Sequence, residues 1–206
     1  MLNLFEYFKI DNRISDLFDR VRAELISSGH EVVWQHTLRV INNLYSIAKL
    51  VDFNFKTALI AAICHDIGYN EVVNGHEQAS VLMMKKILDT MYDNVLVGEI
   101  IHCIEAHECD GNIKPQTIEA MALHDADMLD YCSERGIINA FVLGQSLGLS
   151  EAGTAKRVVK VIEERFLIKQ VINEYGAELN RTEKFFINVV TDLNKERSGF
   201  NKNMIK

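Results

Sequence analysis

The sequence is poor in the residues that interrupt helices. Its 206 residues include a single proline, Pro115, and eleven glycines. A β-sandwich or β-barrel needs many turns, and turns are built largely from glycine and proline. This scarcity argues against both architectures and favours a chain made mostly of helices.

Other absences narrow the function and the location. The formal net charge is −7, and an acidic surface has no general attraction for nucleic-acid phosphates, so we expect no non-specific nucleic-acid partner. The chain contains no apolar run of about 18 residues, the length that a membrane-spanning helix needs, and its N-terminus lacks a secretory pattern. The four cysteines form no CxxC pair and are typical of a reducing compartment. We therefore predict a cytoplasmic protein with no membrane partner.

Apolar residues recur at helical spacing along nearly the whole chain. This periodicity predicts an all-α fold, a single-domain helical bundle spanning residues 1–206 with eight or nine helices. Two polar stretches predict irregular loops at residues 68–76 and 107–116.

Two residues mark predicted helix starts. Pro115 suits the first turn of a helix, where its missing N–H has no partner to lose. Ser150 suits the N-cap of a long segment that continues through Ile172. Residues 150–206 would then form a C-terminal helical extension, with a final helix around residues 185–193.

The histidines are unevenly distributed. None lies beyond His124, although the C-terminal part is rich in other charged residues. This asymmetry indicates one site in the first two-thirds of the chain. The seven are His30, His36, His65, His76, His102, His107 and His124.

Two histidines and one aspartate fall on the core side of predicted helices. His36 is in helical phase with Val40 and Leu44, and His65 ends the apolar run ALIAAIC directly before Asp66. An imidazole and a carboxylate are costly to bury without partners. A bound cation would stabilise both.

A third predicted helix contributes further acidic side chains. Asp127 lies in the stretch MALHDADMLD on a face with Leu123, and its neighbours Asp125 and Asp130 are rival ligands or supporting partners. Three carboxylates so close in an apolar helix repel one another unless they are solvated or bind a metal.

Two imidazoles and two carboxylates suit a divalent metal ion, with Mn²⁺, Co²⁺, Fe²⁺, Mg²⁺ and Zn²⁺ as the candidates. Such a ligand set leaves room for water and a substrate oxygen, as metal-assisted hydrolysis requires. The alternative is that His36 and His65 are hydrogen-bonded core histidines and that Asp66 accepts backbone N–H groups.

Five short motifs, in this order, resemble those of the HD-domain metal-dependent phosphohydrolase superfamily, in particular its small bacterial single-domain members. The resemblance covers residues 30–145, the predicted HD-type metal-binding core. It implies a helical fold, hydrolysis of a phosphoester or phosphoanhydride, and metal binding by His36, His65, Asp66 and Asp127. The motifs are QHTLRV (35–40), AAICHDIGY (61–69), GHEQAS (75–80), CIEAHE (103–108) and HDADMLD (124–130).

The chain departs from the two-metal cyclic-dinucleotide branch of that family, which carries HHE…DG…GYP. Here the stretch is AHECDGNIKP, with Ala106 in place of the first histidine and no GYP tyrosine. We therefore expect one tightly bound ion, with His76 and His107 binding phosphate or a weaker second ion. Arg39, one helical turn after His36, is expected to hold a substrate phosphate. The alternatives are a solvated loop histidine for His76, a helix-end charge for His107 and a surface salt bridge for Arg39.

The expected function is metal-dependent hydrolysis of a small phosphorylated metabolite, with a nucleotide favoured, by metal-activated water. The proposed catalytic residues are Asp66, His76, His107 and Arg39. The alternatives are a nucleotide-sensing HD module without turnover, a two-metal phosphodiesterase and a purely structural helical protein. The histidine-free C-terminal helices would either cover the pocket or form a homodimer.

Overall fold

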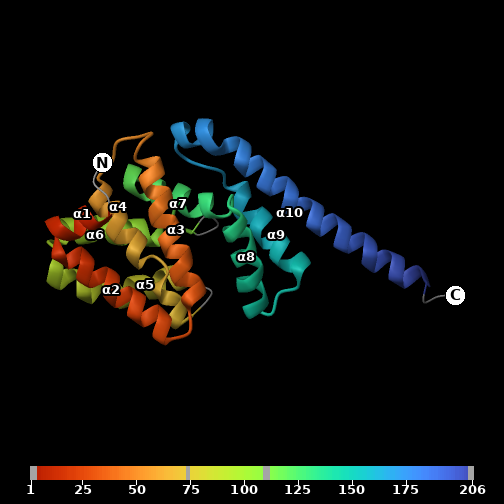
Figure 1. Cartoon of the computed structure of the whole chain (residues 1–206), viewed down its shortest axis with the longest axis horizontal. Coiled ribbons are helices and arrows are strands. Elements are labelled where there is room, and N and C mark those ends of the chain that lie inside the picture. Colours follow the sequence, from red (N-terminus) through yellow and green to blue (C-terminus); the bar gives the residue numbers. More distant parts are fainter. Residues whose placement is uncertain (1–3, 73–74, 109–111, 204–206) are drawn as a thin grey trace. The chain divides into compact units, whose positions relative to one another are not determined.

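The computed structural model of the chain describes residues 4–72, 75–108 and 112–203. Cys109 and parts of the two predicted loops lie outside these residues. The described residues form ten α-helices, one 3₁₀ helix and no strand (Figure 1). The all-α prediction is confirmed, although the expected number of helices was too low by at least one.

The last described helix, with 35 residues, is about twice as long as the next longest, which has 17. The helices are α1 (Leu4–Ile10), α2 (Asn12–Ser27), α3 (Glu31–Ile47), α4 (Phe55–Cys64), α5 (His76–Met91), α6 (Asn94–Glu105), α7 (Ile118–Asp130), α8 (Glu134–Ser146), α9 (Glu151–Glu163) and α10 (Lys169–Asn203), with the 3₁₀ helix η1 at Ile67–Asn70. The residues group into two compact units, residues 1–127 and residues 128–206. The predicted single domain and its inner boundaries stay predictions.

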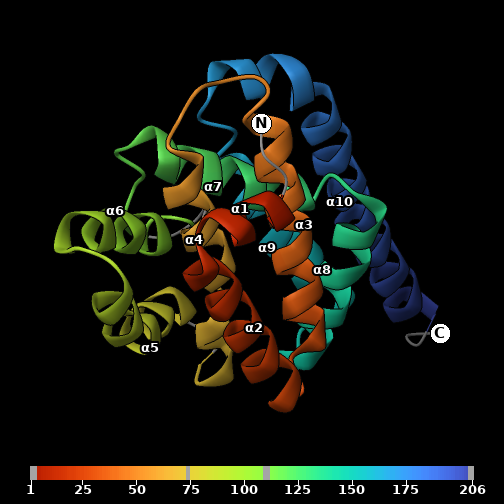
Figure 2. The ribbon, with the colours of Figure 1, turned by 60° about the vertical axis from the view of Figure 1, so that its left-hand side comes forward.

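The first unit is built around α4. Every residue of this helix except Lys56 is buried, which is typical of a helix at the centre of a bundle rather than on its surface. It packs against α3 and α6, and Figure 2 shows it between them. Because α4 ends at Cys64, the next two residues, His65 and Asp66, directly follow a helix at the centre of the bundle.

The predicted helix start at Pro115 is wrong. Helix α7 begins at Ile118, and the residue before it, Thr117, provides the cap: its hydroxyl accepts a hydrogen bond from the N–H of Ala120 (3.2 Å). The N–H of Gln116 donates to Nε2 of His102 on α6 (3.0 Å). This bond holds the segment after the proline against α6 and delays the helix.

The second unit contains α8, α9 and α10, with α9 packed against both of the others. The N-cap at Ser150 is confirmed, since its hydroxyl accepts from the N–H of Gly153 (3.1 Å). The predicted continuation through Ile172 is wrong, because α9 ends at Glu163. Arg165 adopts a left-handed backbone conformation (φ 63°) and binds Glu183 of α10 at 2.8 Å. The separate helix expected around residues 185–193 is part of the long α10.

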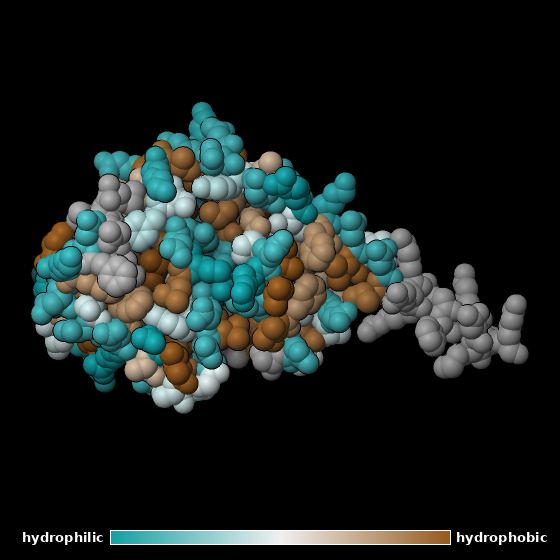
Figure 3. Space-filling model, in the orientation of Figure 1, coloured by the Kyte–Doolittle hydropathy of each residue, from teal (hydrophilic) through white to brown (hydrophobic). Residues whose placement is uncertain are grey.

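The described surface is mixed in character. Hydrophobic side chains are separated by hydrophilic ones on the face that Figure 3 shows. No described helix combines the length and the apolar character needed to cross a membrane.

Asp11, the N-cap of α2, ties three helices together. Its buried carboxylate accepts hydrogen bonds from Nε of Arg13 (2.7 Å) and from Nζ of Lys56 on α4 (2.6 Å). Arg13 also donates to the carbonyl oxygen of Met91 at the end of α5. The hydrogen bond from Arg13 outweighs burial and lowers the pKa of Asp11 from 3.8 to about 2.

We expect Asp11→Ala to lower the free energy of unfolding by about 2 kcal/mol, because it removes both a helix cap and charged hydrogen bonds. Urea denaturation at neutral pH measures this effect. Since the pKa of Asp11 is lowered from 3.8 to about 2, its contribution is complete above about pH 4 and fades as the pH falls towards 2. The difference between wild type and variant should therefore shrink over that range. Asp16→Ala, at an exposed position of α2, should change stability by less than about 0.5 kcal/mol.

Candidate metal centre

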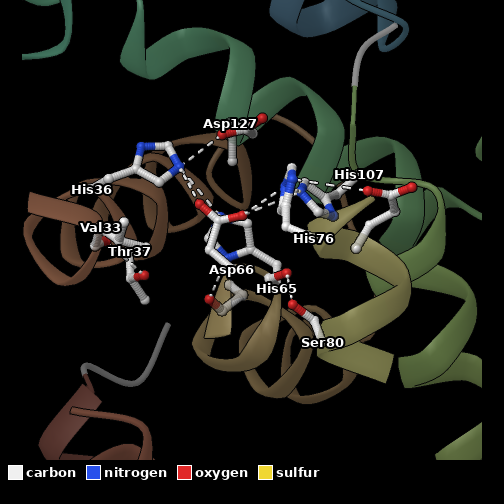
Figure 4. Close-up of polar contacts among 12 residues, drawn as sticks. Val33, His36, Thr37, His65, Asp66, His76, Ser80, His107 and Asp127 are labelled. Atoms are coloured by element: carbon white, nitrogen blue, oxygen red, sulfur yellow. Dashed lines mark hydrogen bonds and ion pairs between the residues drawn. The ribbon is translucent and has the colours of Figure 1, made fainter. Parts of the chain in front are cut away.

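Six polar side chains converge in the first unit (Figure 4). They come from five places in the chain: the middle of α3, the end of α4, the start of α5, the end of α6 and α7. Helices α3 and α6 pack against α4, and α5 packs against the turn η1 that follows it. The six residues are His36, His65, Asp66, His76, His107 and Asp127.

The first group contains the four predicted metal ligands. Nε2 of His36 lies 2.9 Å from Oδ1 of Asp127 and 3.5 Å from Oδ2 of Asp66. Nε2 of His65 lies 3.4 Å from the same oxygen and 3.3 Å from Nε2 of His36. Metal–ligand bonds of about 2.1 Å at right angles place ligand atoms about 3 Å apart. The ligand atoms of His36, His65 and Asp66 all lie within 4.8 Å of one another, so this set can hold a divalent ion, and Asp127 adjoins it through its contact with His36.

Asn43 explains how α7 brings Asp127 to this group. It lies two turns after His36 on α3, and its side-chain amide donates to the carbonyl oxygen of Ala126 (2.9 Å). This bond fixes the backbone of α7 one residue before Asp127. The position of Asp127 is thus set by α3, the helix that also carries His36.

The second group shares Asp66 with the first. Oδ1 of Asp66 lies 3.1 Å from Nε2 of His76 and 3.5 Å from Nε2 of His107. The two imidazole nitrogens are 3.3 Å apart. Each oxygen of Asp66 therefore faces a different pair of histidines, and each set of three residues can hold a metal ion.

Helix ends orient two of the rings. Nδ1 of His65 donates to the carbonyl oxygen of Ala62 (2.8 Å), and Nδ1 of His107 donates to that of Ile104 (2.7 Å). The last carbonyls of a helix lack helical partners. His65 directly follows α4, and His107 lies two residues after the end of α6. Because a carbonyl only accepts, the ring proton stays on Nδ1 when each ring is neutral, and Nε2 is free to bind a metal ion.

Burial and neighbouring charges shift the pKa values of the clustered side chains in opposite directions. Burial lowers the pKa of His65 to about 4. Burial also lowers the pKa of His107, but its ion pair with Asp66 outweighs this and raises the pKa to about 9. Burial raises the pKa of Asp66, yet the surrounding histidines hold it well below its ordinary value. The pKa of Asp127 is lowered in the same way, chiefly by His36 against the effect of burial.

The atoms that are present fit a divalent cation. Oδ1 of Asp66 is buried and makes no hydrogen bond of good geometry with any described residue. A buried carboxylate oxygen without a hydrogen bond is costly. Close imidazole nitrogens on one side and carboxylate oxygens on the other would all gain from a cation between them.

The remaining predicted residues have mixed outcomes. His76 and His107 are buried, at 3% and 2% exposure, so neither is a solvated surface histidine. Asp125 is fully buried and pairs with His124 (3.0 Å). Arg39 is half-buried one turn after His36 on α3, and its role as a phosphate ligand stays a prediction.

Sequence reasoning missed two acids beside the second group. Glu77 and Glu108 form with His76 a third set whose ligand atoms lie within 4.8 Å of one another. Oε2 of Glu77 is 3.8 Å from Nδ1 of His76. Both glutamates directly follow a histidine in the motifs GHEQAS and CIEAHE, which was the available signal.

Residues 33–132 match the family model described as "HD domain". This segment of the chain is an HD domain. All six clustered residues lie inside the matched segment of the HD domain. No curated protein and no solved structure matches the chain. HD domains bind divalent metal ions, in agreement with the donor atoms found here.

Proposed function

We propose that this HD domain is a metal-dependent phosphohydrolase that acts on a small phosphorylated metabolite, with a nucleotide as the favoured substrate. One observation carries the proposal: Asp66, a buried carboxylate, presents its two oxygens to two separate pairs of histidines. Titratable side chains that gather at one buried point with shifted pKa values are typical of functional sites rather than of a purely structural core.

In this proposal, His36, His65, Asp66 and Asp127 hold a divalent ion, with Mn²⁺, Co²⁺, Fe²⁺, Mg²⁺ and Zn²⁺ as candidates. Such an ion lowers the pKa of a bound water and polarises a phosphoryl oxygen. The side chains of His36 and Asp127 are 19% and 14% exposed, whereas that of Asp66 is 7% exposed. The substrate phosphate therefore approaches the side of the cluster formed by His36 and Asp127.

The chain's own residues then have distinct tasks. Asp66, ionised at neutral pH because its pKa is lowered, can accept a hydrogen bond from a water molecule that it contacts and so orient that water for attack. Arg39, one turn after His36, can neutralise phosphate oxygens at the more exposed side. His76 and His107 are too buried to present much surface to a phosphate, so we assign them to a second, weaker ion.

Ion binding at the second group should release a proton. Because the pKa of His107 is about 9, this ring is protonated at pH 7 and must lose its proton to become a ligand. The apparent affinity of this group should therefore fall about tenfold for each pH unit below 9. His65, with a pKa of about 4, has no proton to lose at pH 7. Calorimetry in buffers of different ionisation enthalpy measures the protons released.

The matched variant for this prediction is His107→Gln. It should eliminate the proton-releasing binding step of the second ion and leave binding of the first ion in place. If His107→Gln releases as many protons per ion as wild type, the assignment of His107 to the second ion is wrong.

A substrate panel tests the proposed function. Chelator-treated protein is supplied with Mn²⁺ or Co²⁺ and with p-nitrophenyl phosphate or nucleoside mono-, di- and triphosphates, and the released product is identified. We expect phosphate or pyrophosphate release that requires the metal. Metal-dependent nucleotide binding without any release would instead support the sensing module.

A further inference from the structure

Ser80 has a distinctive place beside the cluster. It lies on α5, one turn after His76, and it is fully buried. Its hydroxyl donates a hydrogen bond to the carbonyl oxygen of His65 (2.6 Å) and accepts one from the N–H of Gly68 (2.9 Å). Figure 4 shows it below His65, on the side away from His36 and Asp127.

These two hydrogen bonds bracket Asp66. The carbonyl of His65 precedes this residue, and the N–H of Gly68 follows shortly after it, where the chain changes from α4 to η1. Backbone groups at such a helix end lack helical partners and need another source of hydrogen bonds. A single hydroxyl therefore fixes the backbone on both sides of the carboxylate that the two groups share.

Gly68 makes this contact possible. A Cβ atom at this position would lie 2.0 Å from the carbonyl oxygen of His76 and 2.6 Å from the backbone nitrogen of Ser80. Neither backbone atom can move away without shifting the helix that contains it. The first turn of α5, which carries His76, is thus docked directly on the turn that carries Asp66.

We propose that Ser80 is a positioning residue for the metal centre. It holds the turn around Asp66 in one register against α5, so that Oδ2 meets His36 and His65 while Oδ1 meets His76 and His107. This inference rests on the proposed role of Asp66 as a metal ligand. Loss of the hydroxyl should weaken metal binding as well as destabilise the fold. Removing a group that orients a metal ligand typically lowers metal affinity by about 10- to 100-fold.

The test compares three variants by two measurements. The dissociation constant for Mn²⁺ is measured by electron paramagnetic resonance of the free ion, and the melting temperature is measured on metal-free protein. Ser80→Ala should raise the dissociation constant by about tenfold or more. Ser80→Thr keeps the hydroxyl and should stay close to wild type. Thr57→Val is the matched control, because it removes a fully buried hydroxyl from α4 at the end far from His65.

We expect Thr57→Val to lower the melting temperature without changing Mn²⁺ affinity. If Ser80→Ala behaves in the same way, Ser80 is a structural residue and the inference is wrong. Should Ser80→Ala not fold, Ser80→Cys, whose thiol is a weaker donor, is judged by the same criterion. If wild type itself fails to bind Mn²⁺, the proposed function fails first, so the two failures are distinguishable.

Discussion

Replacing Asp66 by asparagine should reduce metal-dependent phosphate release by at least about a thousandfold, which corresponds to about 4 kcal/mol of transition-state stabilisation. The substitution removes the negative charge shared by both groups of histidines. It also turns one carboxylate oxygen into an NH₂ group, which donates hydrogen bonds and does not bind metal. Asp66 is the member common to the set with His36 and His65 and the set with His76 and His107, so its loss affects both.

Steady-state kinetics with the best substrate of the panel measures this effect, and circular dichroism checks that the fold is retained. Asp11→Asn is the matched control, because it also neutralises a buried carboxylate of the first unit but lies outside the cluster. It should cost stability and leave turnover unchanged at a temperature where the variant is folded. Substantial turnover by Asp66→Asn would refute the proposed mechanism.

Mn²⁺ should stabilise the folded protein, and Asp127→Asn should abolish most of this stabilisation. At a concentration about 100 times its dissociation constant, a ligand of the folded state adds about 2.7 kcal/mol to the free energy of unfolding. Asp127 contributes because its Oδ1 lies 2.9 Å from Nε2 of His36. The substitution removes the negative charge and turns one carboxylate oxygen into an NH₂ group, so the more exposed side of the first group loses its anionic ligand.

Helix α7 supplies a stringent control in Asp125, which is also buried but pairs with His124. Asp125→Asn should lower the melting temperature of the metal-free protein and keep the rise on addition of Mn²⁺. Thermal unfolding with and without the ion gives both values. The choice of Asp127 over its neighbour is wrong if the rise survives in Asp127→Asn or vanishes in Asp125→Asn.

The helical periodicity of the sequence predicted the fold class and the faces of α3 and α4 correctly, because burial in a bundle is governed by apolar spacing. It failed where a local contact ends a helix. The bond between Gln116 and His102 delays α7, and the left-handed Arg165 separates α9 from α10 although the apolar spacing continues through Phe166 and Val171. The spacing of apolar side chains carries little information about where the backbone leaves the helical conformation.

The same division applies to the cluster. Motifs identified the residues that come together, since histidine and aspartate are conspicuous at core positions of an apolar helix. The motifs gave no indication of the groups that hydrogen-bond to the candidate ligands or to the backbone around them. The carbonyls of Ala62 and Ile104 and the hydroxyl of Ser80 act through the ends of α4 and α6, and their roles depend on where each helix stops.

The anchoring of His65 and His107 at helix ends has a further consequence for the speed of ion capture. Because both rings are immobilised when the chain folds, an arriving ion does not have to freeze their rotation. Its association rate should then depend on how fast the ion sheds its own hydration shell, so that sluggishly dehydrating Mg²⁺ would enter more slowly than Mn²⁺.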